Sequence, residues 1–197
     1  MSNIYTYKIG ENLYINLTNK CNCQCSFCVR NNGDIFGHKL WLDNEPNISQ
    51  VINEVKTHAK LSNIKEIVFC GFGEPTYRIE SIIEIAKALK ALNIPIRIDT
   101  NGHGDLINSK NIVPLIKGLI DAVSVSLNAP NKKRYDELVK SIFDNAYEAM
   151  IQFVKDCIEF GIKTILTVVD ILSEEEKKEC EKIAKELGAE FRVRQII

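Results

Sequence analysis

The chain has 197 residues, of which 45% are hydrophobic and 26% are charged, and its formal net charge is −1. This length predicts a single domain over residues 1–197 with one hydrophobic core. The near-zero charge gives no broad basic surface and argues against a nucleic-acid partner, and no apolar run is long enough to cross a membrane.

Short apolar or alternating runs predict six strands separated by helices. The expected strands are 12–18, 66–70, 94–100, 122–127, 164–169 and 191–196. The expected helices start after Asn47, a favourable N-cap, and further along cover 79–92, 112–118, 145–160 and 173–187. Strict alternation predicts a parallel sheet with right-handed crossovers, and six strands are too few for a closed eight-stranded barrel. We therefore expect an α/β fold: an open, partial (βα)6 TIM-like barrel with outer helices, whose chemistry lies at the carboxyl ends of the strands.

Four of the seven cysteines follow the first expected strand within eight residues. Cys21, Cys25 and Cys28 have the spacing Cys-x3-Cys-x2-Cys, and three thiolates so close in sequence can bind one iron–sulfur cluster. In a cube of four irons, three cysteines leave one iron without a protein ligand. Such an iron can bind a small molecule and act on it.

Two other interpretations of this run use Cys23. Zinc could bind all four thiolates, but structural zinc sites usually draw ligand pairs from two separate turns, and no second Cys-x2-Cys follows. A disulfide is less favoured, because the chain does not start like a signal peptide and its cysteine count is odd. We therefore interpret Cys23 as a spare thiol and expect the protein in the reducing cytoplasm.

The three-cysteine spacing, with the aromatic Phe27 before the last cysteine, resembles the signature of the radical S-adenosylmethionine (SAM) superfamily. The resemblance implies a [4Fe–4S] cluster on Cys21, Cys25 and Cys28, with SAM chelated at the open iron through its amino and carboxylate groups. An electron from the cluster then breaks a carbon–sulfur bond of SAM, which gives methionine and a 5′-deoxyadenosyl radical that abstracts hydrogen from a substrate. The resemblance also implies a partial (βα)6 barrel.

The second expected strand ends in a glycine-rich turn, Gly71-Phe72-Gly73-Glu74-Pro75. It resembles the Gly-Gly-Glu motif of the superfamily, with Phe72 in place of one glycine. The role implied for Gly73 and Glu74 is to accept hydrogen bonds from the methionine amino group of SAM. A plain glycine turn capped by a carboxylate is the alternative.

Period-two alternation on the fourth expected strand puts Ser124, Ser126 and Asn128 on one face. A polar face on a central strand is costly to bury unless something hydrogen-bonds to it, and a ligand could be that partner. By resemblance, Ser126 and Asn128 match a ribose-contacting element of the superfamily, although Asn128 replaces an acid there. Polar residues facing water are the alternative.

Two further strand ends supply expected cofactor contacts. Asn101 belongs to a Thr-Asn-Gly stretch that resembles one near SAM and substrate in glycyl-radical-enzyme activases. Val169 ends the fifth expected strand, where the superfamily often packs an apolar residue on adenine. Both signals are weak in isolation, because Asn-Gly is an ordinary turn signal and core packing equally explains a valine.

The last expected strand and the segment after the cysteines can each be interpreted in two ways. Arg192 and Arg194 alternate with apolar residues on the last expected strand, so they either face an anionic substrate across the barrel or protect an edge strand from pairing. Residues 29–46 form a long polar segment, which is either part of the substrate wall or a surface loop anchored by a buried Trp41. No metal-ligand spacing relates the three histidines, so we assign no chemistry to His38, His58 and His103.

At finer grain the chain resembles the small radical SAM proteins associated with TatD-type hydrolases, a family without a well-established substrate. The resemblance lies in residues 13–21, 27–30, 40–42, 69–75 and 120–130. It implies an enzyme that uses SAM on a small molecule, nucleoside or peptide, with an electron donor such as flavodoxin or ferredoxin. A glycyl-radical-enzyme activase acting on a partner protein, and a non-catalytic iron–sulfur or zinc-binding module, stay open as alternatives.

Overall fold

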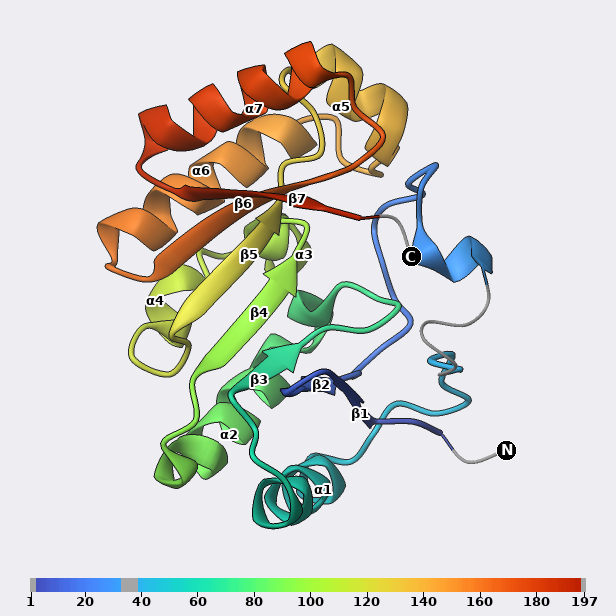
Figure 1. Cartoon of the computed structure of the whole chain (residues 1–197), viewed down its shortest axis with the longest axis vertical. Helices are drawn as coiled ribbons and strands as arrows, with labels where there is room; N and C mark the ends of the chain where they lie inside the picture. The colour runs from blue at the N-terminus through green and yellow to red at the C-terminus, as the bar shows by residue number, and fades with distance from the viewer. Residues whose placement is uncertain (1–2, 33–38, 196–197) are drawn as a thin grey trace.

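The computed structural model describes residues 3–32 and 39–195, and its centre is a curved sheet of seven strands. Figure 1 shows the helices lying along the outer side of this sheet. The strands follow one another in chain order across the sheet, and β2 to β7 are parallel. The predicted open, partial parallel barrel is therefore confirmed.

The strand bounds agree with the sequence pattern to within a few residues. The strands are β1 (Thr6–Ile9), β2 (Asn12–Ile15), β3 (Glu66–Phe69), β4 (Ile96–Thr100), β5 (Ala122–Ser126), β6 (Lys163–Val169) and β7 (Glu190–Arg194). Residue 196, expected to end the last strand, lies outside the described residues.

The sequence pattern missed β1, which pairs antiparallel with β2. The turn between them contains Gly10, whose φ of +60° is a conformation that glycine adopts without strain. Tyr7 of β1 stacks on Tyr14 of β2 with ring centroids 5.2 Å apart. Because β1 has only four residues, the alternation of residues 6–9 is too short to predict a strand. The sheet therefore has seven strands where six were expected.

More helices connect the strands than the five expected. They are α1 (Ile48–Leu61), α2 (Ile79–Leu89), α3 (Gly104–Asn108), α4 (Val113–Ile116), α5 (Lys132–Val139), α6 (Ala146–Glu159) and α7 (Glu174–Leu187), with the 3-10 turns η1 (Val29–Asn32), η2 (Pro75–Arg78) and η3 (Lys90–Leu92). The pattern missed α3 and α5. In α5 the first three residues are basic, and only Tyr135, Leu138 and Val139 are buried, so its hydrophobic signal is weak.

The two faces of the sheet differ in polarity. On the outer face, residues such as Ile98, Val123 and Leu166 pack with helix residues such as Ile82 and Phe153 into one buried core. Because side chains alternate along a strand, their neighbours in sequence point to the inner face. Polar side chains line this face at several strands, and those used below are Glu66, Arg97, Asp99, Ser124, Ser126, Thr167, Arg192 and Arg194.

Within the described ranges, no helix is both long enough and apolar enough to cross a bilayer.

Candidate active site

The cysteine run forms a loop after β2 and before η1, and all three expected cluster ligands in it are half-buried free thiols. Backbone hydrogen bonds attach this loop to the segment that ends α5. The amides of Gln24 and Ser26 donate to the carbonyl oxygens of Val139 (3.1 Å) and Leu138 (3.0 Å). In return, the Ile142 amide donates to the Asn22 carbonyl oxygen at 2.9 Å. Backbone contacts with the end of α5 thus hold the loop in place.

The environment of the loop favours thiolates. The pKa values of Cys21 and Cys25 lie below the ordinary value, chiefly because the Cys23 thiol hydrogen-bonds to both sulfurs. The same contacts raise the pKa of Cys23. Thiolates, not thiols, are the form that binds metal.

Arg30 holds the loop from the other side. Its Nε donates to the Cys28 sulfur at 3.4 Å, while its two terminal nitrogens donate to the carbonyl oxygens of Asn19 and Cys23, each at 3.3 Å. One guanidinium therefore connects the entry and the middle of the loop to the sulfur of Cys28. Apart from the position of Arg30 two residues after Cys28, no sequence pattern indicates this role.

Among the described side chains, no group of three or more His, Cys, Asp or Glu surrounds one metal-ion position. A cubane offers a separate iron to each cysteine, so its ligands need not converge on one point. Cys23 is buried and also approaches Asn101 Nδ2 (3.5 Å) and His103 Nδ1 (3.7 Å).

A buried polar network lies behind the loop, and its centre is His103, which is fully buried. The Asn22 amide nitrogen lies 2.7 Å from His103 Nδ1 and can only donate, so Nδ1 accepts. Nε2 therefore carries the proton, and it lies 3.1 Å from the Ala146 carbonyl oxygen and 3.0 Å from the Tyr135 hydroxyl. Burial lowers the pKa of His103 to about 4. The histidine that received no role is thus a neutral support of the cysteine loop.

Gly73 lets the turn after β3 pass directly against the chain that enters the cysteine loop. A Cβ at this position would lie 2.4 Å from the Thr18 carbonyl oxygen and 2.6 Å from that of Lys20. The next amide, that of Glu74, donates to the Lys20 carbonyl oxygen at 2.8 Å. Only glycine allows this approach, because any side chain would push the two backbones apart.

The Glu74 carboxylate is buried and joins the ends of β3 and β4. It accepts hydrogen bonds from the Thr76 amide (3.1 Å) and hydroxyl (2.7 Å), the Thr100 hydroxyl (2.8 Å) and the Asn101 amide (2.7 Å). Burial raises its pKa. The carboxylate therefore caps η2, as the capped-turn alternative expects, while the contact of Gly73 and Glu74 with SAM stays a prediction.

Two expected cofactor residues have hydrogen-bonding arrangements that bear on ligand binding. Asn101 is fixed against the cysteine loop, because its Nδ2 donates to Asn22 Oδ1 at 2.8 Å. Asn128 has a φ of +55° and is only 5% exposed, and its Oδ1 has no hydrogen-bond partner among the described residues. A buried acceptor without a donor is costly. A ribose hydroxyl of SAM is the kind of donor that would satisfy it.

The remaining expected cofactor residues are Ser126, Val169 and Phe27. Ser126 ends β5, and its hydroxyl accepts from Arg194 at 3.3 Å. Val169 ends β6 and is buried, while Phe27 is half-buried against the main core. The structure thus puts the expected site residues at the carboxyl ends of β2 to β6. Within the part of the chain that the structure describes, Glu74 after β3 and Asn101 after β4 are the ones that hydrogen-bond to the cysteine loop or its entry.

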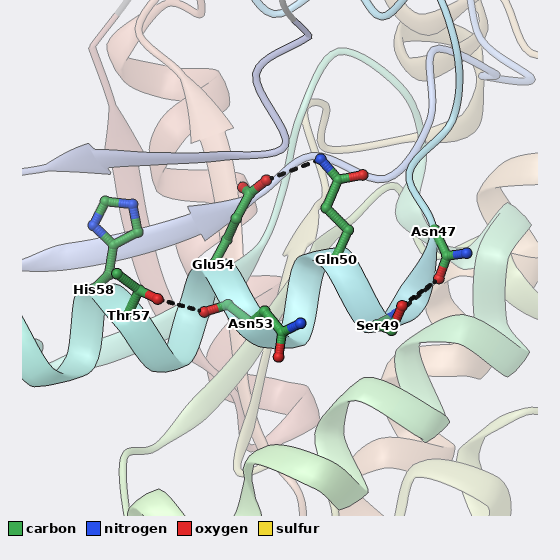
Figure 2. A pocket seen from close by; sticks show the side chains of 7 residues that line it. All are labelled: Asn47, Ser49, Gln50, Asn53, Glu54, Thr57 and His58. Carbon is green, nitrogen blue, oxygen red and sulfur yellow. Dashed lines mark hydrogen bonds between the residues drawn. The ribbon is translucent and has the colours of Figure 1, made fainter.

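The hollow drawn in Figure 2 is unrelated to this site. It runs along the polar face of α1 and is lined by Asn47, Ser49, Gln50, Asn53, Glu54, Thr57 and His58. The contacts drawn there stay within the helix and its cap, such as that from Gln50 to Glu54 at 3.2 Å. This hollow therefore gives no sign of a ligand.

The long segment after the cysteines is not anchored by its tryptophan, as one alternative expected. Trp41 is 59% exposed, and the anchor is its neighbour Leu40, which is fully buried and whose carbonyl oxygen accepts from Asn16 at 2.6 Å. His38 lies outside the described residues.

Together, fold and site define an open parallel barrel with a three-cysteine loop at the carboxyl ends of its strands. Residues 15–187 match the family model described as the Radical SAM superfamily. The chain therefore belongs to the radical SAM superfamily.

Relatives and solved structures agree with this membership. The chain is 29% identical over 179 residues to a Thermococcus kodakarensis protein named a probable GTP 3′,8-cyclase, covering 90% of this chain and 54% of the relative. It is 33% identical over 122 residues to a Methanocaldococcus jannaschii protein named for a glycyl-radical enzyme activating function, covering 61% and 44%. The chain thus spans about half the length of these relatives.

The fold is also that of SuiB from Streptococcus suis, whose structure was solved with its precursor peptide SuiA. The TM-score is 0.73 at 22% identity, covering 93% of this chain and 39% of SuiB.

Proposed function

We propose that this protein is a radical SAM enzyme, which uses a [4Fe–4S] cluster to cleave SAM reductively and abstract hydrogen from a substrate. The observation that carries the proposal is the loop of three half-buried thiols at the carboxyl ends of the parallel strands. When bound, such a cluster supplies one electron and an open iron position for SAM. Cys21, Cys25 and Cys28 would hold it.

The surrounding residues would bind SAM and orient it and the cysteine loop. The Cys23 thiol lowers the pKa values of Cys21 and Cys25 by hydrogen bonds to their sulfurs, and Arg30 donates a hydrogen bond to the Cys28 sulfur. The unpartnered Asn128 oxygen is an acceptor for a ribose hydroxyl, and Val169 is a buried apolar surface for adenine. Glu74 keeps the β3 and β4 ends in register, so that Asn101 stays against the loop.

Within the superfamily, we place the chain with the small TatD-associated proteins, because of the sequence stretches that resemble them. All seven cysteines are free, which fits the reducing cytoplasm. A small redox protein such as flavodoxin or ferredoxin would deliver the electron. The substrate would be a small molecule, a nucleoside or a peptide.

A second candidate function is activation of a glycyl-radical enzyme. The Methanocaldococcus jannaschii relative, 33% identical over 122 residues, carries that name and favours it. In that case the hydrogen would come from a partner protein.

Anaerobic reconstitution with iron and sulfide, followed by dithionite and SAM, tests the main proposal. We expect 5′-deoxyadenosine from the wild-type protein and none from Cys21→Ala, Cys25→Ala or Cys28→Ala, which should also bind less iron. Cys180→Ala is the matched control, since Cys180 is a buried cysteine of α7 outside the loop, and it should keep the wild-type iron content and yield of 5′-deoxyadenosine.

Cys23→Ala separates a three-ligand from a four-ligand site. It should retain the cluster and SAM cleavage, with lower stability because a buried side chain is lost. Loss of the cluster from this variant, while the folded protein persists, would refute the ligand assignment.

A further inference from the structure

The inner face of the sheet carries more positive than negative side chains. Arg97 lies between two carboxylates: it bonds Glu66 at 3.0 Å and also forms an ion pair with Asp99. Both carboxylates thus pair with Arg97, and Asp99 also faces the β7 arginines: burial raises its pKa, while the charges of Arg97, Arg194 and Arg192 oppose this rise. Arg192 and Arg194 on β7 share the inner face with them, because they alternate with Phe191, which packs on the core.

The two β7 arginines reach across β6 to β5. One terminal nitrogen of Arg192 donates to the Ser124 hydroxyl and one of Arg194 donates to the Ser126 hydroxyl, each at 3.3 Å. Within residues 3–32 and 39–195, neither guanidinium forms an ion pair with a carboxylate. A guanidinium has five N–H donors, so most of those on Arg192 and Arg194 remain for another acceptor.

An inward-pointing charge can protect an edge strand and can also face a ligand on the inner face of a sheet. Arg192 and Arg194 turn inward over the sheet, and both residues remain exposed. They are thus accessible to a ligand that lies on the inner face.

The arginines also border the proposed SAM site. Arg194 pairs in register with Val169, and Arg192 with Thr167, while the hydroxyl that Arg194 contacts belongs to Ser126. A substrate beside SAM would therefore meet both guanidiniums. Two residues along a strand separate their backbones by about 6.6 Å, a span over which two long side chains can converge on one group.

We propose that Arg192 and Arg194 form an oxyanion subsite that holds a phosphate or carboxylate group of the substrate. The assignment of this group to a substrate rests on the proposed function. Guanidinium is suited to both groups, because its planar pair of donors matches two oxygens.

Isothermal titration of the full-length reconstituted protein, without reductant, tests the subsite with pyrophosphate and succinate as probes. We expect saturable binding of at least one probe by the wild-type protein. Arg192→Gln and Arg194→Gln should each weaken binding about tenfold or more, since each removes a charge-assisted hydrogen-bond donor set. Arg192→Lys and Arg194→Lys should retain part of the affinity, because the charge remains.

The matched control is the double variant Lys56→Gln/Lys60→Gln, which removes two positive charges from the exposed surface of α1 and should bind like wild type. Binding of pyrophosphate alone indicates a phosphate-bearing substrate, and binding of succinate alone indicates a carboxylate. Binding of neither probe by wild type, or equal binding by folded Gln variants, overturns the subsite.

The two proposals fail separately in these assays. A protein that cleaves SAM but binds neither probe loses the subsite alone. A protein that binds a probe through Arg192 and Arg194 but never yields 5′-deoxyadenosine keeps an oxyanion site and loses the radical function.

Discussion

His103 shows how burial decides what a single residue does. The side chain lies between Asn22 of the cysteine loop and Tyr135 of α5, and no water-exposed surface remains on it. With one ring nitrogen accepting and the other donating, only the neutral imidazole satisfies both neighbours. Its role is therefore to position the loop from behind, without contact to a reacting atom.

The burial of neutral His103 predicts that the folded protein loses stability in acid. The pKa of His103 is about 4 in the folded protein, below its ordinary value of 6.5. Above pH 6.5 both states are neutral and stability does not depend on this group. As the pH falls from 6.5 to 4, the unfolded chain binds a proton that the folded chain excludes, so the free energy of unfolding falls by up to about 3 kcal/mol.

Urea unfolding of the wild-type protein and of His103→Gln between pH 4.5 and 7.5 measures this contribution. The variant should lose stability at pH 7 but show a flatter pH profile. His58→Gln, on the outer helix α1, is the control and should keep the wild-type slope. An unchanged slope in a folded His103→Gln would contradict the neutral-histidine assignment.

Sequence spacing identified the cysteines but not their support. Cys21, Cys25 and Cys28 are close in sequence, so their pattern is visible without a structure. The contact between Asn22 and His103 spans 81 positions, and that between Tyr135 and His103 spans 32. No spacing rule reports such pairs, because they depend on how the strands bring distant loops together.

At the scale of elements, the β3 turn approaches the entry of the cysteine loop closely at Gly73. Gly73→Ala should push these backbones apart, since the added carbon would meet the carbonyl oxygens of Thr18 and Lys20. We expect a loss of about 1–3 kcal/mol in the free energy of unfolding, by analogy with overpacking, and less iron bound per chain.

The matched control for Gly73→Ala is Gly188→Ala at the end of α7. Gly188 has a φ of +82° and open space around it, so alanine there should cost a comparable 1–2 kcal/mol or so through backbone strain alone. Its iron content should equal that of wild type. Normal iron content and stability in Gly73→Ala would mean that the loop entry adjusts freely.

Element prediction succeeded where a strand or helix carried its own hydrophobic pattern. The six parallel strands and the long helices α1, α2, α6 and α7 did so. In contrast, α5 buries few residues, and β1 owes its place to pairing with β2 and to the ring stacking of Tyr7 on Tyr14. Their stability comes from tertiary contacts, which the local sequence does not reveal.

For the whole molecule, protein contacts support the cysteine loop. Backbone bonds to residues 138–142 and the Arg30 contacts hold it. We therefore expect the cluster-free protein to keep its secondary structure, unlike a small zinc domain that unfolds without metal. Far-UV circular dichroism of the reconstituted and the chelator-treated protein measures this.

Hydrogen exchange gives a local version of the same test. In the cluster-free protein the amides of Gln24 and Ser26 should exchange more slowly than those of an unfolded chain, because each donates to a carbonyl oxygen. If these two amides exchange as fast as in an unfolded chain, or if the circular dichroism signal is lost, the cluster is what organises the loop.

If the loop keeps its shape without the cluster, the chain can fold first and take up iron and sulfide afterwards. Should oxidation then break the cluster down, fresh iron and sulfide, with electrons from a reductant, would rebuild it on the same folded chain without new protein synthesis.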